Sequence, residues 1–568
     1  MGPAVPTLRQ RLASTKLFAR HGLCWPALAL LPHLAAFTIM LLTEFTATAM
    51  TAFVLAWAIL NFFWLMLTRR LVLSGTLSLL MMTVLVLLSQ LKYHVLMMTA
   101  NFVDLMIVDT DTVSFLFMIF PALRWAVGLS LVVLLPLVVI TWRLDPFRMR
   151  RRIAAALIVP CLGGLTALEM QFPMQPFEAW YGGNLVSSFA RSGVDAVAEL
   201  MTSGLMQSAA FAGDRLDPIG NTCVPAAKPP HIILIHDESS FDIRVAPGIK
   251  VPSGYGAHFK SFDGKQRNVL VEGSGGPSWY TEYNVLEGLS ARSFGRFAYF
   301  VTRIAAGRVN RGLPTALQRC GYRTVSLYPA LGAFMSARSF QATTGVQRFY
   351  DQHDLGAREL EPDSFFFDAA ARMIAEQHEH GPIFVFVYLA ANHFPWDYRY
   401  RPDLTPQWKD PGNVAPVDEY LRRQAMSAKD YADFLARLKR EFSNESFLLV
   451  RFGDHQPDFA SFLIDPTLDE NGIAQRLMAY DPRYFTTYYA IDAVNFKPVD
   501  LSSARDTLEG PYLPLVVQEA AGLPLESSFA EQKNILSRCD GLFYGCADGA
   551  EARRFNRMLI DAGLIKNL

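Results

Sequence analysis

The sequence predicts an α-helical membrane domain of five spans, followed by an α/β domain with a mostly parallel sheet. The first third of the 568 residues consists of long runs of Leu, Met, Phe, Val and Ala, whereas the remainder has the composition of a soluble domain. In that remainder short apolar runs alternate with helical patterns, which is typical of a parallel sheet covered by helices. We expect three parts: a transmembrane domain over 1–170, interfacial helices and a linker over 171–230, and the α/β domain over 231–568.

Five stretches are long and apolar enough to cross a membrane, since a spanning helix needs roughly 20 mostly apolar residues. They are 23–42, 47–67, 71–91, 125–142 and 153–170. A cleaved signal peptide followed by a buried helical domain is the alternative, but a signal peptide has one short apolar region. The number and length of the stretches therefore favour a multi-pass membrane domain.

The charges between these stretches indicate their orientation. Basic residues precede the first stretch and lie between the second and third and between the fourth and fifth; they are Arg9, Arg11, Lys16, Arg20, Arg69, Arg70, Arg143, Arg148, Arg150, Arg151 and Arg152. The segment between the first two stretches carries only Glu44. Basic loops stay in the cytoplasm, so everything after about Gln171 is predicted to lie outside it.

Two segments next to the spans are less regular. Residues 92–124 are apolar but interrupted by Asn101, Asp104, Asp109 and Asp111. They form either an amphipathic or re-entrant helix in the outer interface or a loop packed against the bundle. Residues 194–206 suit a helix lying along the membrane, and 213–230, rich in Pro, Gly and Asp, indicate a linker.

Four cysteines fall in the outer part of the chain, where disulfides persist. Four cysteines allow three pairings. Closeness in sequence favours Cys539 with Cys546, which leaves Cys223 with Cys320, and free buried thiols are the alternative.

Polar residues follow three apolar runs, 231–235, 383–389 and 447–452, that have the character of buried parallel strands. The segments that follow are His236-Asp237-Glu238-Ser239-Ser240, Asn392-His393-Phe394-Pro395 and Gly453-Asp454-His455. Any one of them is ordinary polar surface. Sites in such sheets form beyond the carboxyl ends of the strands, so the three together predict a metal or phosphate site.

A glycine-rich turn, Glu272-Gly273-Ser274-Gly275-Gly276-Pro277-Ser278, has the character of a nucleophile turn. Its glycines let backbone amides approach an oxyanion, and a helix predicted over 282–289 stabilises anions at its start. The alternative is a flexible loop whose Ser278 or Thr281 caps that helix.

In this order the motifs resemble the alkaline phosphatase and sulfatase superfamily. More narrowly they resemble its membrane branch: lipoteichoic acid synthases, glucan phosphoglycerol transferases and lipid A phosphoethanolamine transferases. That branch has about five spans before an extracytoplasmic catalytic domain, so the resemblance covers most of the chain. It implies a protein of the bacterial inner membrane with an alkaline phosphatase-like catalytic domain in the periplasm.

The resemblance also implies roles for particular residues. Glu238 falls on the first acidic metal ligand, Asp454 and His455 on an aspartate–histidine ligand pair, and His393 on a substrate-side histidine. Ser278 falls on the nucleophile, which is also a metal ligand.

Two departures from the pattern leave alternatives open. The membrane branch usually has threonine as nucleophile, so Ser274 and Thr281 stand beside Ser278 as candidates. Asp237 replaces a small residue and is either a ligand to a second metal or a polar neighbour; we expect the neighbour.

The residue types favour phosphoryl chemistry with a divalent metal. Carboxylate oxygens with a histidine nitrogen suit Zn²⁺ or Mn²⁺, and coordination activates a serine hydroxyl. We expect a phosphoserine intermediate at Ser278, with His393 protonating the leaving oxygen or holding the phosphate. Sulfate ester hydrolysis is disfavoured, because Gly-Pro-Ser-Trp-Tyr lacks the Cys/Ser-x-Pro-x-Arg arrangement of classical sulfatases.

The resemblance implies transfer of phosphoglycerol or phosphoethanolamine from a membrane phospholipid donor to an envelope glycan or lipid acceptor. The alternatives are a phosphodiesterase, phosphatase or sulfatase-type hydrolase, and a non-catalytic lipid-binding regulator of the same fold. The retained ligand residues count against the regulator. A net charge of zero, without a basic stripe interleaved with aromatics, argues against nucleic acid as a partner.

Overall fold

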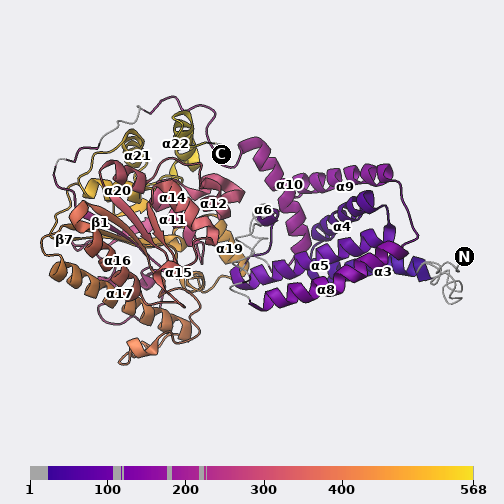
Figure 1. The fold of residues 1–568 in the computed structure, drawn as a ribbon, viewed down its shortest axis with the longest axis horizontal. Coiled ribbons are helices and arrows are strands. Elements are labelled where there is room, and N and C mark those ends of the chain that lie inside the picture. The colour runs from indigo at the N-terminus through magenta and orange to yellow at the C-terminus, as the bar shows by residue number, and fades with distance from the viewer. Residues whose placement is uncertain are drawn as a thin grey trace, which may run out of the picture. The chain divides into compact units, whose positions relative to one another are not determined.

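The computed structural model describes residues 24–96, 98–105, 117, 121–174, 182–216, 223–225, 227–566 and 568. The chain divides into two compact units, Met1–Glu199 and Leu200–Leu568 (Figure 1). The first unit is helical and the second contains the sheet.

The helices of the first unit correspond to the predicted spans. They are α3 (Cys24–Thr43), α4 (Ala47–Thr68), α5 (Leu71–Leu96), α6 (Phe102–Leu105), α8 (Pro121–Leu144), α9 (Arg151–Gln171) and α10 (Leu185–Ser203). Among the described residues α4, α5, α8 and α9 contain stretches long and apolar enough to cross a membrane. The predicted first span lies in α3, whose apolar stretch Leu28–Thr43 is shorter. Four of the five expected spans are therefore found by length and composition.

Of the two irregular segments, only parts can be compared with prediction. Most of 106–120, and 217–222 of the predicted linker, lie outside the described residues. The helix expected over 194–206 is α10, which begins earlier because Glu44 caps its first turn: Val186 N donates to Glu44 Oε1 at 3.0 Å. A buried ion pair, Arg191 Nε to Glu169 Oε2 at 2.5 Å, ties α10 to α9.

The second unit is built on an eight-stranded mixed sheet in the order β4-β3-β5-β1-β6-β7-β2-β8. The strands are β1 (His231–Asp237), β2 (Arg267–Leu270), β3 (Arg323–Leu327), β4 (Arg348–Tyr350), β5 (Ile383–Tyr388), β6 (Phe447–Gly453), β7 (Thr486–Val494) and β8 (Thr507–Glu509). The five strands from β4 to β6 run parallel, whereas β7 runs antiparallel to both β6 and β2. The three strands predicted from apolar runs are β1, β5 and β6, and β1 lies between the other two.

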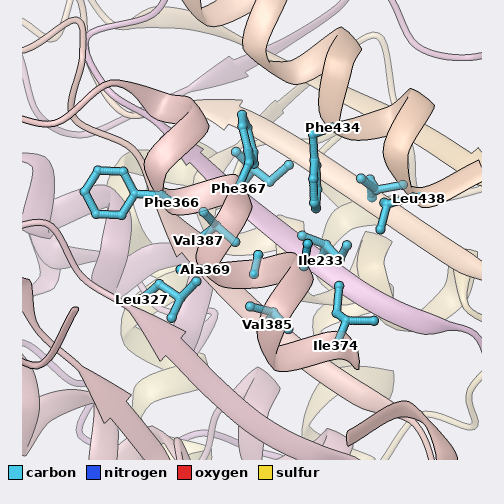
Figure 2. Packing of buried hydrophobic residues seen from close by; sticks show 14 of the residues in the cluster. Ile233, Leu327, Phe366, Phe367, Ala369, Ile374, Val385, Val387, Phe434 and Leu438 are labelled. Atoms are coloured by element: carbon cyan, nitrogen blue, oxygen red, sulfur yellow. The ribbon is translucent and has the colours of Figure 1, made fainter. Parts of the chain in front are cut away.

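Helices α16 (Asp363–Gln377) and α17 (Ala415–Glu441) cover one face of the parallel strands. Figure 2 shows Ile233 and Val385 of the sheet packed against Phe367 of α16 and Phe434 of α17. The rings of Phe367 and Phe434 stack at a centroid distance of 4.7 Å. Every residue of β1, β5 and β6 is buried, as expected for strands covered on both faces.

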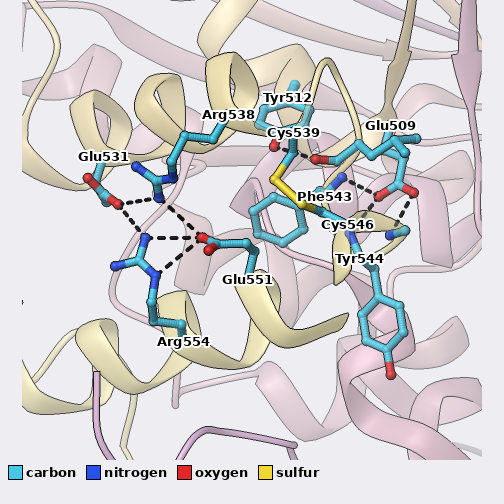
Figure 3. Close-up of a disulfide and its surroundings, with 12 residues drawn as sticks. Glu509, Tyr512, Glu531, Arg538, Cys539, Phe543, Tyr544, Cys546, Glu551 and Arg554 are labelled. Atoms are coloured by element: carbon cyan, nitrogen blue, oxygen red, sulfur yellow. Dashed lines mark hydrogen bonds and ion pairs between the residues drawn. A yellow bond between two sulfur atoms is a disulfide. The ribbon is translucent and has the colours of Figure 1, made fainter. Parts of the chain in front are cut away.

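The remaining helices lie between the strands or, from α20 on, follow β8. They are α11 (Ser278–Glu287), α12 (Val301–Ala305), α13 (Leu313–Arg319), α14 (Ala337–Thr344), α15 (Gln352–Leu355), α18 (Ala460–Ile464), α19 (Glu470–Met478), α20 (Leu513–Ala520), α21 (Ser527–Arg538) and α22 (Ala550–Asp561). Both favoured cysteine pairings are formed, Cys223 with Cys320 and Cys539 with Cys546. The second disulfide closes the loop that joins α21 and α22 (Figure 3).

Candidate functional site

The site forms where β1 and β6 end. The parallel register places Asp237 opposite Gly453, so Glu238 and Asp454 leave the sheet from neighbouring positions. His455 Nε2 lies 3.3 Å from Asp454 Oδ2 and 3.5 Å from Glu238 Oε1. All three side chains are buried, and the predicted cluster is therefore brought together at the carboxyl edge of the sheet.

The hydrogen bonds of His455 direct one ring nitrogen toward this cluster. Its Nδ1 lies 2.9 Å from the backbone carbonyl of Gln456. A carbonyl oxygen only accepts, so in the neutral ring Nδ1 carries the proton and Nε2 presents its lone pair. This is the arrangement commonly found in metal-binding histidines, whose other nitrogen donates to a carbonyl or carboxylate.

Ser278 is the hydroxyl that the structure places against these side chains. Its Oγ lies 3.1 Å from His455 Nε2, and Ser278 is the first residue of α11. The helix starts four residues before its predicted beginning at 282. A Cβ on Gly273 would lie 2.9 Å from the Pro277 carbonyl oxygen, and Gly275 has φ +70°, so the tight turn requires its glycines.

The alternative hydroxyls are placed differently. Thr281 Oγ1 donates to the backbone carbonyl of Asp454 at 2.6 Å, which fixes its proton in a structural hydrogen bond. Ser274 is half-buried within the turn. The geometry therefore favours Ser278 over Thr281 as the nucleophile.

His236 belongs to the cluster, although the sequence analysis assigned it no role. His236, Glu238 and Asp454 each offer a ligand atom, and these atoms lie within 4.8 Å of one another. His236 Nε2 lies 3.1 Å from Asp454 Oδ2, and its buried ring stacks on Tyr388 at 3.7 Å. Strand alternation gives the signal that was missed, because residues 236 and 238 lie on the same face of β1.

Asp237 points to the opposite face of the sheet. His258 Nε2 lies 2.8 Å from Asp237 Oδ2, and the Tyr488 hydroxyl donates to the same oxygen. Asp237 is thus a polar neighbour with its own partners, as expected, and it does not join Glu238 and Asp454.

The electrostatics of the cluster suit a divalent cation. Burial and the adjacent charge of Asp454 raise the pKa of Glu238 well above its usual range. Burial also opposes ionisation of Asp454, but the nearby His455 and His236 lower the pKa of Asp454 below its usual range. The buried Asp454 Oδ2 lies 3.1 Å from His236 Nε2 and 3.3 Å from His455 Nε2. Two adjacent buried carboxylates and histidine nitrogens match the ligand preferences of Zn²⁺ and Mn²⁺.

His393 lies in the loop after β5 and is held by its backbone. Arg423, fully buried on α17, donates to the carbonyl oxygens of His393 at 2.7 Å and Pro395 at 2.9 Å. Burial lowers the pKa of His393, and the charge of His455 lowers it further. Its Nδ1 lies 2.8 Å from the Phe394 carbonyl, so the neutral ring keeps a lone pair on Nε2. Among the described residues His393 makes no hydrogen bond to the carboxylates.

Residues 278–500 match the family model described as Sulfatase. This part of the chain is a sulfatase-family domain. The sulfatase-family domain includes Ser278, His393, Asp454 and His455, whereas Glu238 precedes the matched residues. The match agrees with the superfamily that the motifs resemble. No curated protein sequence matches the chain.

Several solved structures are similar to the chain. The lipoteichoic acid synthase LtaP from Listeria monocytogenes has 16% identity over 53% of this chain and 74% of that chain, with a TM-score of 0.41. The Streptococcus pyogenes phosphoglycerol transferase GacH in complex with sn-glycerol-1-phosphate has 13% identity over 61% of this chain and 87% of that chain, with a TM-score of 0.44. The integral membrane lipooligosaccharide phosphoethanolamine transferase A (EptA) from Neisseria meningitidis has 13% identity over 87% of this chain and 95% of that chain, with a TM-score of 0.40.

Proposed function

We propose that the protein transfers a phospholipid head group with its phosphate, phosphoglycerol or phosphoethanolamine, to a hydroxyl of an envelope glycan or lipid. One observation carries this proposal. The Ser278 hydroxyl lies 3.1 Å from His455 Nε2, at the start of α11 and beside two buried carboxylates. The site combines a nucleophile, metal-type ligands and a helix start that favours anions, and this combination suits phosphoryl transfer.

The metal in this proposal is Zn²⁺ or Mn²⁺, held by Glu238, Asp454, His455 and Ser278, with His236 as a further donor. When bound, the ion favours the alkoxide form of the serine and offsets charge on the phosphoryl oxygens. Two adjacent buried carboxylates, with two histidine nitrogens 3.1 Å and 3.3 Å from Asp454 Oδ2, support a cation at this place.

In the first step Ser278 Oγ attacks the lipid phosphorus, and the bond between phosphorus and the diacylglycerol oxygen breaks. The serine proton ends on that leaving oxygen, and the head group stays on Ser278 as a phosphodiester. In the second step the acceptor hydroxyl attacks the same phosphorus and releases Ser278, which regains a proton. His393 Nε2, neutral and with its lone pair available, is suited to remove the acceptor's proton.

The membrane domain fits a lipid donor. Four described stretches are long and apolar enough to span a bilayer, and the basic residues lie in alternate loops. We propose five spans in a bacterial inner membrane, with residues 231–568 as the catalytic part on the outer side. A tethered domain then meets lipid head groups in the outer leaflet.

The test uses detergent-purified protein with Zn²⁺ or Mn²⁺, incubated with phosphatidylglycerol and separately with phosphatidylethanolamine. We expect diacylglycerol release from one of the two lipids and at least a 10³-fold loss of this release in Ser278→Ala, as for other nucleophile deletions. Adding an alcohol acceptor that becomes labelled distinguishes a transferase from a hydrolase. No release from either lipid, together with no bound metal, would contradict the proposal and favour a regulator of the same fold.

A further inference from the structure

A cavity lies at the beginning of the nucleophile turn. It has a volume of about 280 Å³ and is lined by three segments. The first is the end of β2 with Glu272, the second is the loop from Ala479 to Phe485, and the third is Leu542–Asp548 within the loop near the Cys539–Cys546 disulfide. Figure 3 shows Glu509, another lining residue, bonded to the backbone of this third segment.

Arg292 is the cation of this cavity, and its guanidinium group lies between two tyrosine rings. The guanidinium carbon is 3.6 Å from the Tyr480 ring centroid and 4.4 Å from that of Tyr544. These ring contacts involve the flat face of the guanidinium group, so its edge, which carries the N–H donors, remains for hydrogen bonds. In the described part of the chain the buried Arg292 Nε has no hydrogen-bond partner.

Two carboxylates face the same cavity, and the protein holds them in place. Glu272 Oε2 accepts from Ala291 N at 2.7 Å and from Asn284 Nδ2 at 2.8 Å. Glu509 accepts from three successive backbone N–H groups, of which only Gly545 N donates to Oε1, at 2.9 Å. A carboxylate oxygen can accept about two hydrogen bonds, so Glu509 Oε1 keeps an acceptor position.

We propose that this cavity binds one ring of a neutral saccharide. Sugar hydroxyls accept from the edge of Arg292 and donate to Glu509, and the two tyrosine rings hold the guanidinium group in place. An anion would meet three carboxylates, those of Glu272, Glu509 and Asp548, against one guanidinium. At about 30 Å³ of liquid volume per water molecule, the cavity has room for a group the size of about nine waters, which accommodates a hexose ring.

The cavity shares structure with the reaction site. Glu272 begins the turn that ends at Ser278, and Val271 N donates to the Phe485 carbonyl at 2.9 Å. Gln456, next to His455, donates to the Arg483 carbonyl at 2.9 Å. One short turn and one loop of the chain therefore connect the cavity to Ser278 and its surroundings. The cavity is therefore a subsite for a glycan acceptor, a role that rests on the proposed function, whereas sugar binding itself does not.

The experiment measures binding of glucose, galactose, N-acetylglucosamine and maltose to the full-length, detergent-purified protein by ligand-observed NMR and calorimetry. Inorganic phosphate is titrated in parallel. We expect saturable binding of at least one sugar, weakened at least tenfold in Arg292→Lys, which keeps the charge but loses the planar group between the rings. The matched control is Arg338→Lys, since Arg338 also lies over an aromatic ring, 4.9 Å from the Phe349 centroid, outside the cavity.

Three results would overturn the inference: no sugar binds the wild-type protein, Arg292→Lys binds sugar as tightly as the wild type, or phosphate alone binds in an Arg292-dependent way. The wild-type titration tests whether the protein binds sugar even where a variant does not fold. The same wild-type sample, assayed for diacylglycerol release, separates the two proposals. Sugar binding by a wild-type protein that releases no diacylglycerol from either lipid would refute the transferase and leave the saccharide site standing.

Discussion

Replacing Glu282 by glutamine should stabilise the second unit of the chain relative to the wild type, and increasingly so as the pH rises. Glu282 lies on α11, one turn after Ser278, and only 1% of its surface is exposed. Its Oε1 accepts a hydrogen bond from Gln341 Nε2 at 2.8 Å. Burial raises the pKa of this carboxyl group from 4.5 to about 8. The folded protein therefore keeps Glu282 neutral at pH 7, and glutamine is a neutral replacement of the same shape.

The magnitude follows from proton linkage. Between pH 4.5 and about 8 the folded protein holds a proton on Glu282 that the unfolded chain releases. The folded state binds more protons in this window, so the free energy of unfolding falls as the pH rises, by up to about 1.4 kcal/mol per pH unit. From pH 5 to pH 8 the loss attributable to Glu282 is about 3.5 kcal/mol. Glu282→Gln removes this loss and keeps an acceptor for Gln341.

The assay is denaturant unfolding of the detergent-purified protein, wild type and Glu282→Gln, at pH 5, 6, 7 and 8. The difference between the two proteins cancels the titration of all other groups. We expect this difference to grow with pH in favour of the variant, whereas Glu376→Gln, at an exposed position on α16, should show no such trend. Equal pH dependence for wild type and Glu282→Gln would refute the argument that burial keeps this carboxyl group protonated.

Three further predictions concern the metal, the loop that carries His393 and a disulfide. Asp454→Asn should abolish stoichiometric Zn²⁺ or Mn²⁺ binding, measured by elemental analysis; full metal content would contradict the ligand assignment. Arg423→Lys should lower kcat/KM for the lipid about tenfold at unchanged metal content, because one ammonium group cannot replace both bonds to the His393 loop; loss of metal instead would show a wider structural role. Replacing Cys223 and Cys320 by serine should cost about 4.7 kcal/mol in unfolding free energy, since this pair closes a loop with a sequence separation of 97; an unchanged denaturation midpoint would contradict it.

The part of the site that follows strand ends was predictable from the sequence. β1, β5 and β6 are uninterrupted apolar runs, and adjacent parallel strands end at one edge of the sheet. Those two facts suffice to bring Glu238 near Asp454 and His455. The disulfides were predictable from spacing, because Cys539 and Cys546 are only seven residues apart.

Other features depend on packing that no local pattern contains. Alternation along β1 suggests that His236 and Glu238 point to the same side, but the approach of His236 to Asp454 depends on the pairing of β1 with β6. Strands β4 and β8 have three residues each, too few to show alternation. The cavity around Arg292 joins segments more than 180 positions apart in the chain, from residue 292 to Tyr480 and beyond. Helix α11 begins at Ser278, directly after Pro277 and four residues before the predicted start at 282.

The most direct test of the central claim is to look for the covalent intermediate. The metal-loaded protein is incubated with phosphatidylglycerol or phosphatidylethanolamine without an acceptor, quenched in acid, and digested for peptide mass spectrometry. The account predicts one head-group phosphate on Ser278, absent after chelation of the metal and absent in Ser278→Ala. Diacylglycerol release that persists in Ser278→Ala, or an adduct on Ser274 or Thr281 instead, would contradict it.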